Sequence, residues 1–210
     1  MIKQLSAMFF SVLLGLGLAV PAMAADTPDV LVKGVTSEVL AIIKADKDLQ
    51  SGNMKKLIEL VDARILPHFN FTRMTALAVG REWTKATPEQ KARLAAEFKI
   101  LLVRTYANAL VSYKNQSIDY KPLRMAPTDV EVTVKTEVRQ SSGQPIQLDY
   151  SLQKKDDGWK VFDIVVAGVS LVTNYRDSFG QEIRNGGIDG LIASLVTKNQ
   201  QASASVGKKS

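Results

Sequence analysis

The spacing of hydrophobic residues is helical over the first half of the chain. Thr87, Pro88 and Gln90 form a helix start, because threonine caps the first turn, proline suits its first position and glutamine completes a capping box. Pro67 and Gly80 are expected to end the second and third helices. Apolar residues that recur every three or four positions predict helices over residues 28–44, 53–65, 69–79 and 88–113.

After the fourth predicted helix, apolar residues recur at every second position. Short turns at Ser141–Gly143 and Asp156–Gly158 predict that consecutive strands pair as an antiparallel meander. Helical spacing returns after the sheet in two segments separated by Gly186 and Gly187. We therefore expect an α+β fold, in which about six helices cover a curved antiparallel sheet of about four strands. The predicted strands are residues 118–120, 130–139, 146–152 and 159–166, and the two later helices are residues 171–183 and 189–196.

The first 24 residues have the layout of a secretory signal peptide. Lys3 supplies a positive charge, Ala7–Val20 is an apolar run, and Ala22-Met23-Ala24 places small residues before a cleavage site at Ala25. The apolar run is shorter than the ~20 residues that a transmembrane helix needs. No cysteine follows it, which excludes a bacterial lipoprotein anchor. We expect export to the periplasm.

The composition limits the kinds of chemistry that the protein can perform. The 210 residues carry a net charge of +6 and include no cysteine and one histidine. Thiolate chemistry, disulfides and cysteine-ligated zinc are therefore excluded, and a single histidine is a poor basis for a metal site. A basic exported chain suits lipid headgroups or acidic proteins rather than nucleic acid. We expect a monomer with one domain over residues 25–199 and a disordered tail over residues 200–210.

A search for catalytic groups finds only isolated candidates. The chain has no G-x-S-x-G, no H-E-x-x-H and no phosphate-binding glycine loop. Asp156-Asp157-Gly158 is ordinary turn chemistry, although it could bind a cation. Asp163 lies in an apolar strand, where it acts as a base if buried or, more commonly, pairs with an arginine or a backbone group. His68 follows Pro67 and is expected to make a structural hydrogen bond.

The apolar helix faces have two interpretations. They either pack a filled core or line a cavity, and periodicity alone does not decide. An exported α+β domain with clustered aromatic residues and no catalytic motif fits a carrier of an apolar ligand. The aromatic residues on helices expected to face the sheet are Phe69, Phe71, Phe98, Tyr106, Tyr175 and Phe179.

Five segments, in order along the chain, carry a family pattern. They are Phe71–Trp83 (FTRMTALAVGREW), Phe98–Tyr106 (FKILLVRTY), Trp159–Asp163 (WKVFD), Gly168–Ser170 (GVS) and Asn174–Phe179 (NYRDSF). Together they resemble the MlaC family of toluene-tolerance, periplasmic phospholipid-binding proteins. The resemblance extends from about residue 28 to residue 199, nearly the whole chain after the signal segment.

The resemblance implies an NTF2-like cone with acyl chains inside and the headgroup near its mouth. It implies a carrier that moves phospholipid between an outer-membrane lipoprotein–porin complex and an inner-membrane ABC transporter with an MCE substrate-binding subunit. Such transport maintains the lipid asymmetry of the outer membrane, with phospholipid as cargo and no cofactor, metal or catalytic residue. Two alternatives stay open: an NTF2-like periplasmic enzyme with Asp163 as its base, and a structural adaptor with a filled core.

The predicted faces supply candidate ligand contacts. Arg73, Arg81 and Arg176 are candidates for the headgroup or for acidic partners, and structural pairing, for instance with Asp163, is the alternative for each. The candidates for an apolar pocket are Met74 and Leu77 on the third helix, Leu102, Tyr106 and Leu110 on the long helix, Val132, Val134, Leu148 and Tyr150 on the strands, and Val172, Tyr175 and Phe179 after the sheet.

Overall fold

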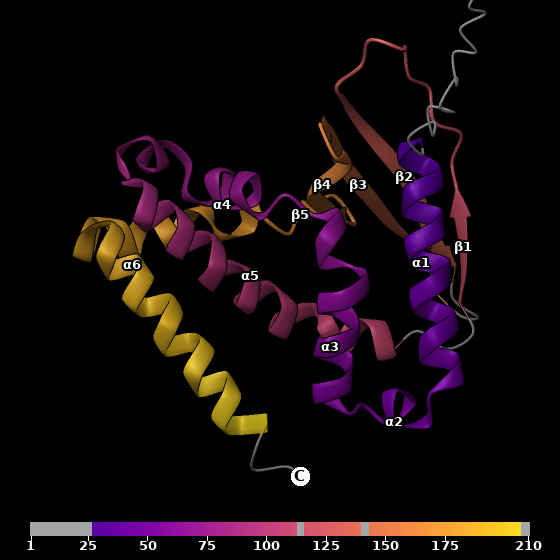
Figure 1. Ribbon diagram of the computed structural model, residues 1–210, viewed down its shortest axis with the longest axis horizontal. Coiled ribbons are helices and arrows are strands. Elements are labelled where there is room, and N and C mark those ends of the chain that lie inside the picture. Colours follow the sequence, from indigo (N-terminus) through magenta and orange to yellow (C-terminus); the bar gives the residue numbers. More distant parts are fainter. Residues whose placement is uncertain (1–26, 113–115, 140–142, 207–210) are drawn as a thin grey trace, which may run out of the picture.

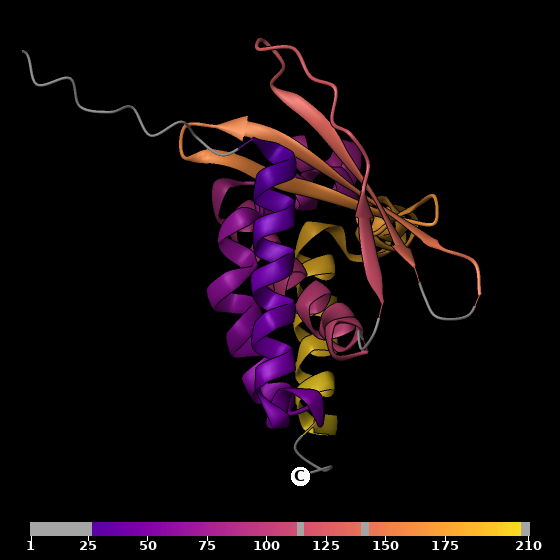
Figure 2. The ribbon, with the colours of Figure 1, turned by 90° about the vertical axis from the view of Figure 1, so that its right-hand side faces the viewer.

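Helices and sheet form two distinct parts of the molecule (Figure 1). The computed structural model describes residues 27–112, 116–139 and 143–206, so the expected signal peptide lies outside the described residues. Figure 2 shows the twisted sheet across one end of the helical layer. The α-helices are α1 (Pro28–Ala45), α2 (Lys47–Gln50), α3 (Met54–Arg64), α4 (Phe71–Val79), α5 (Pro88–Val111) and α6 (Arg176–Val206), and the 3₁₀ turns are η1 (Leu66–His68), η2 (Gly80–Lys85) and η3 (Thr173–Tyr175).

The sheet is an open antiparallel meander of five strands in the order β1-β2-β3-β4-β5. The predicted α+β fold with an antiparallel sheet is confirmed. Strand β5 could not be predicted, because its two residues are too few to show an alternating pattern. The strands are β1 (Ser117–Tyr120), β2 (Glu131–Arg139), β3 (Ile146–Lys155), β4 (Gly158–Val166) and β5 (Val169–Ser170).

Strand β4 contains a bulge that changes which residues share a face. Leu152 on β3 pairs with Val161, but the preceding residue Ser151 pairs with Asp163, so Phe162 has no partner on β3. Directly paired residues of an antiparallel sheet lie on the same face. Val161 and Ile164 therefore share a face of the sheet, and Asp163 lies on the opposite face.

The helix starts follow the capping rules. The Thr87 hydroxyl accepts a hydrogen bond from the Gln90 amide at 3.2 Å, and the Gln90 side chain accepts one from the Thr87 amide at 3.0 Å. This reciprocal pair confirms the predicted capping box of α5. Asparagine side chains cap α3 and α4, where Asn53 accepts from the Lys56 amide and Asn70 from the Arg73 amide.

Helix α1 packs on two different partners along its length. Near its start, Val32 is buried with Val134, Leu152 and Val161 of the sheet. Farther along, Val39 and Ile43 are buried with apolar residues of α2, α3 and α5. One half of the helix therefore covers the sheet and the other half joins the helical layer, as Figures 1 and 2 show.

A third cluster fills the space between α4, α5 and α6. Its centre is aromatic. The ring centroid of Phe98 lies 5.1 Å from that of Tyr175 and 5.2 Å from that of Phe179, in edge-to-face contacts. Edge-to-face pairs at this separation are favourable beyond the area they bury. Phe98 and Phe179 are fully buried, so this part of the helical layer is a filled core.

The segment after the sheet differs from the prediction. We expected a helix from residue 171, but residues 169–175 form β5 and η3, and α6 begins at Arg176. The reason is a set of hydrogen bonds to β4: the Leu171 amide donates to the Ile164 carbonyl at 2.8 Å, and the Val172 amide donates to the Asp163 carboxylate at 3.3 Å. These bonds hold the chain against the strand before a helix can start.

The predicted break between two C-terminal helices is a kink at Gly187, where φ is 68° and ψ is −169°. The last helix then continues through Val206, so residues 200–206 are helical where we expected a disordered tail. Gln200, Gln201 and Ala202 suit a helix, and the next helix-breaking residue is Gly207. Residues 207–210 lie outside the described part.

Substitution of the kink glycine tests its backbone role. Gly187→Ala is expected to destabilise the protein by about 1–3 kcal/mol, because glycine alone adopts this combination of φ and ψ without strain. A Cβ atom at Gly187 meets nothing within 4 Å, so the effect is conformational rather than steric. The measurement is the urea midpoint of unfolding.

Gly186→Ala is the matched control. A Cβ atom also meets nothing within 4 Å at Gly186, whose φ lies outside the left-handed range. This variant should leave stability unchanged or raise it by up to about 1 kcal/mol. Equal midpoints for the two variants would contradict the assigned strain.

Candidate functional site

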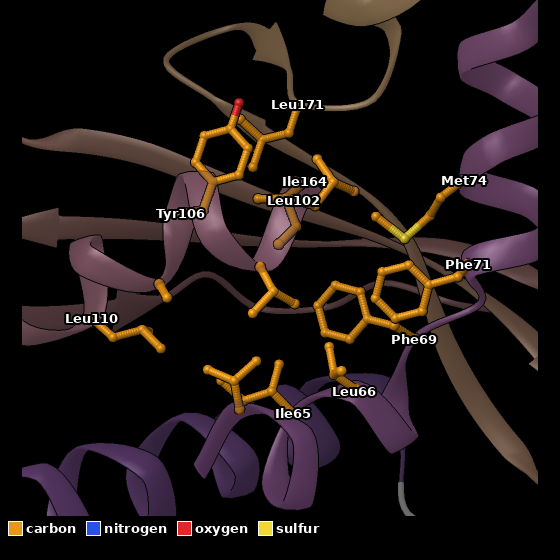
Figure 3. Close-up of a pocket in the computed structure, with 13 residues that line it drawn as sticks. Ile65, Leu66, Phe69, Phe71, Met74, Leu102, Tyr106, Leu110, Ile164 and Leu171 are labelled. Atoms are coloured by element: carbon orange, nitrogen blue, oxygen red, sulfur yellow. The ribbon is translucent and has the colours of Figure 1, made fainter. Parts of the chain in front are cut away.

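An apolar chamber lies between α5, the end of α3, the start of α4 and strand β4 (Figure 3). We call it the α5 chamber. It contains about 670 Å³ of space free of atoms, part of it open to solvent. The lining side chains are uncharged, and they are Val61, Ile65, Leu66, Phe69, Phe71, Met74, Leu102, Val103, Tyr106, Ala107, Leu110, Ile164 and Leu171.

Local structure explains why these side chains converge. Leu102, Tyr106 and Leu110 follow one another at four-residue spacing, so they form one stripe along α5. After α3 ends, Pro67 in η1 turns the chain toward the sheet, which brings Leu66 and Phe69 to the same space. Figure 3 shows side chains from both segments pointing toward a common centre.

A second apolar chamber, the α1 chamber, lies between α1 and the sheet. It contains about 690 Å³ of space free of atoms, again partly open. Ile65, Phe69, Leu110 and Ile164 line both chambers and therefore form their common wall. The other lining residues of the α1 chamber are Leu31, Val32, Val35, Thr36, Val39, Leu40, His68, Tyr150 and Val161.

The titratable side chains in these walls are held in their neutral forms. Burial raises the pKa of Tyr106 to about 12, with a further contribution from the neighbouring Tyr175. Burial also raises the pKa of Tyr150, and burial together with the charge of Lys160 lowers the pKa of His68. At neutral pH the walls are thus uncharged, which favours an apolar ligand because nothing charged must be desolvated.

A basic groove borders the α5 chamber. Leu66, Phe69 and Phe71 line both spaces, so the groove and the chamber meet at these residues. The groove also carries four cationic side chains and one carboxylate, which are Arg73, Lys99, Lys155, Lys160 and Asp157. A phosphate placed here would face an excess of positive charge.

The cations of the groove differ in how they are engaged. Lys160 pairs with Asp157 at 2.9 Å and donates to the Pro67 carbonyl at 2.9 Å. In the part of the chain that the structure describes, no carboxylate pairs with Lys99 or Lys155. These two lysines are therefore the ones available to an anionic group.

The three candidate arginines lie in three different settings. Arg73 borders the groove, pairs with Glu131 at 2.6 Å, contacts Gln153 and lies 3.6 Å above the Phe162 ring. Arg176 donates two hydrogen bonds to the Leu77 carbonyl, at 3.2 and 2.8 Å. Arg81 is exposed in η2 and does not line the groove. The structure therefore does not bring the three arginines together.

The predicted pocket residues also separate into two groups. Met74, Leu102, Tyr106 and Leu110 line the α5 chamber, and Leu110 and Tyr150 line the α1 chamber. The others pack elsewhere. The α4–α5–α6 cluster contains Val172, Phe179, Leu77 and Tyr175. Val132 and Val134 pack between the sheet and α1, and Leu148 lies half-buried opposite Thr136.

Several lining residues were missed by the sequence analysis. Ile65 and Leu66 precede Pro67, and Phe69 follows it, so the proline that ends α3 was the available signal for this junction. Leu31, Val35 and Val39 lie on the apolar stripe of the first predicted helix, which we had not assigned to a ligand. Lys155 and Lys160 flank the predicted Asp156–Gly158 turn, which places both at one end of the sheet.

The isolated catalytic candidates have structural roles. Asp163 is 8% exposed, accepts a hydrogen bond from the Val172 amide, and lines neither chamber nor the groove. Asp157 pairs with Lys160 at the β3–β4 turn. Among the described residues, no three His, Asp or Glu side chains come close enough to hold a metal ion. Nor is any described helix long and apolar enough to cross a membrane.

Comparison with known proteins relates this architecture to a family. The toluene tolerance protein ttg2D of Pseudomonas putida is 29% identical over 168 residues, which cover 80% of this chain and 78% of that protein. The intermembrane phospholipid transport system binding protein MlaC of Haemophilus influenzae is 26% identical over 186 residues, covering 87% and 85%.

A solved structure has the same fold. The phospholipid-binding protein of Ralstonia solanacearum, in complex with a phospholipid, superposes with a TM-score of 0.78 and 42% sequence identity. The match covers 85% of this chain and 99% of the other. The family model described as MlaC protein matches residues 33–197. The chain belongs to the MlaC family.

Proposed function

We propose that this protein is a periplasmic phospholipid carrier that shuttles lipid between membrane complexes and so maintains outer-membrane lipid asymmetry. The observation that carries the proposal is the pair of uncharged chambers that share a wall, beside a groove with unpaired lysines. Acyl chains occupy the chambers in this proposal, and the phosphate of the headgroup lies in the groove. The phospholipid in the Ralstonia relative supports it, because the two chains share the fold at 42% identity.

The energetics of acyl chains explain why a carrier is needed. Two acyl chains have about 28 methylenes, and exposing each to water costs about 0.8 kcal/mol, so free release is opposed by more than ~20 kcal/mol. This value lies near the upper limit of non-covalent affinity. A carrier therefore delivers lipid by docking and passing it along an apolar path, not by releasing it into water.

The proposed docking partners follow the family assignment. They are an outer-membrane lipoprotein–porin complex and an inner-membrane ABC transporter with an MCE substrate-binding subunit. The relative named as part of an intermembrane phospholipid transport system supports this placement. The two alternatives have less support. A periplasmic enzyme would use Asp163 as its base, but Asp163 accepts a hydrogen bond from the Val172 amide away from the chambers. A structural adaptor would have a filled core, but the space between α1, α5 and β4 is open.

A charge in the common wall should prevent loading. Leu110 lines both chambers, so Leu110→Asp is expected to lower the amount of bound phospholipid more than about tenfold, because a buried carboxylate without a partner is costly. Mass spectrometry of organic extracts gives the lipid-to-protein ratio. Ala109→Asp, on the exposed face of α5, is the control and should retain its lipid. Equal lipid in both variants would contradict the assignment of the chambers.

Loaded protein should hold its cargo in the absence of an acceptor. After gel filtration into lipid-free buffer, the lipid-to-protein ratio is expected to stay constant for hours, because release exposes the acyl chains. Acceptor vesicles or an apolar resin in the same buffer should accelerate the loss. Rapid loss into plain buffer would rule out a carrier of this kind.

The unpaired lysines should contribute a salt-dependent part of the affinity. The double variant Lys99→Ala, Lys155→Ala is expected to bind phosphatidylglycerol about three- to tenfold more weakly at low salt, the scale of two exposed charge contacts. The difference should vanish near 1 M salt. Fluorescence titration with a labelled lipid measures it, and Lys47→Ala, Lys55→Ala on α2 and α3 is the control. Equal weakening in both double variants would argue against a headgroup site in the groove.

A further inference from the structure

Phe69 borders three spaces at once. Its side chain lines the α5 chamber, the α1 chamber and the basic groove. It also packs against two of the hydrophobic clusters, the one between α4, α5 and α6 and the one between α1 and the sheet. Phe69 therefore lies where the compartments meet.

The backbone around Phe69 is held in place. The Phe69 amide donates to the Leu66 carbonyl at 3.1 Å, and the next amide, that of Asn70, donates to the Val161 carbonyl at 2.8 Å. Phe69 and Val161 also form a bridge between neighbouring chain segments. These contacts hold the segment against β4, so the ring is part of the wall between the chambers.

The ring itself is oriented by a neighbour. Phe69 stacks on Phe71, with ring centroids 5.8 Å apart and planes 21° from parallel. Figure 3 shows both rings at the end of the α5 chamber that lies next to η1. Phe71 lines the α5 chamber and the groove but not the α1 chamber. Of this pair, only Phe69 separates the two chambers.

Two chambers of similar size and one polar groove suit a particular ligand shape. The two chambers are matched in size, with about 670 and 690 Å³ of space free of atoms, part of it open to solvent. A lipid whose phosphate lies in the groove can send one chain to each side of the Phe69 ring. A one-chain lipid leaves a chamber empty, and a four-chain lipid has two chains for each.

We propose that Phe69 is the branch point that separates the two acyl chains of a bound lipid and makes the site selective for two-chain lipids. The inference rests on the proposed carrier function and adds the number of chains to it. Phe69 is then a specificity-determining residue, since it decides which lipids fit without being needed to hold the phosphate.

Competition between two lipids of the same headgroup chemistry tests the branch point. Delipidated protein is loaded from mixed vesicles of phosphatidylglycerol, with two chains, and cardiolipin, with four. Native mass spectrometry then gives the bound ratio. Wild type should prefer phosphatidylglycerol, and Phe69→Ala should reduce the preference about tenfold, the scale on which a change of pocket shape discriminates apolar ligands.

Phe71→Ala is the matched control, because it removes the same ring from the same stack without joining the chambers. It enlarges the α5 chamber for both lipids alike, so the ratio in which the two lipids bind, rather than the total amount bound, should stay that of wild type. Equal preferences in Phe69→Ala and Phe71→Ala would overturn the branch point while leaving the carrier function intact. Wild type that takes up neither lipid would instead contradict the carrier function itself.

A second variant tests the same idea without altering Phe69. Val35 lines the α1 chamber and not the α5 chamber, so Val35→Trp should fill one of the two. Phosphatidylglycerol binding should fall more than about a thousandfold, since displacing one of its chains into water exposes many methylenes at about 0.8 kcal/mol each, while one-chain lysophosphatidylglycerol should bind as in wild type. Cooperative thermal unfolding confirms that each variant is folded. A folded Val35→Trp protein that binds both lipids equally well, or neither, would overturn the proposal.

Discussion

The contact on which the candidate site depends is the attachment of the α3–α4 connection to strand β4. The Asn70 amide donates to the Val161 carbonyl, and Phe69 forms a bridge to the same residue. This attachment fixes the chain between the helical layer and the sheet. The α5 chamber lies on one side of this connection and the α1 chamber on the other, since Phe69 lines both. The space that remains on each side is apolar because Leu110 and the other wall residues come from the buried stripes of amphipathic elements.

Most of the fold could be predicted from the sequence, because its signals are local. The capping box at Thr87 and Gln90 and the alternation along β2 and β3 each predict their element directly. The segment before α6 could not be predicted in this way. Residues 171–175 have helical spacing, but Ile164 and Asp163 of the preceding strand, seven and nine residues earlier, accept hydrogen bonds from the Leu171 and Val172 amides. A tertiary contact of this kind overrides local propensity, and periodicity contains no information about it.

The candidate site was predictable only in part, for a related reason. A hydrophobic stripe shows which side of a helix or strand is buried. It does not show whether side chains of the neighbouring element fill the space that the stripe faces. Leu102 and Phe98 are on the same helix and equally apolar, yet Leu102 lines a chamber and Phe98 is enclosed by Tyr175 and Phe179. The difference arises because Phe98 faces two aromatic rings, whereas Leu102 faces a space that is not filled by side chains. Lys155 lies near the groove because of the turn between β3 and β4, and only the assembled sheet shows this.

The bulge at Phe162 has a consequence for how this sequence can vary. If β4 continued without the bulge, with Phe162 opposite Ser151, Asp163 would pair with Tyr150 and lie on the face now occupied by Ile164, which lines both chambers. The bulge thus keeps the carboxylate away from the apolar chambers and directs it to the Val172 amide instead. A homologue that pairs this stretch without a bulge but at the same length would need an apolar residue at the position of Asp163 and another acceptor for that amide, whereas deletion of the bulged residue would leave the carboxylate on its present face. The pairing register of β4 and the polarity of the chamber walls are therefore coupled.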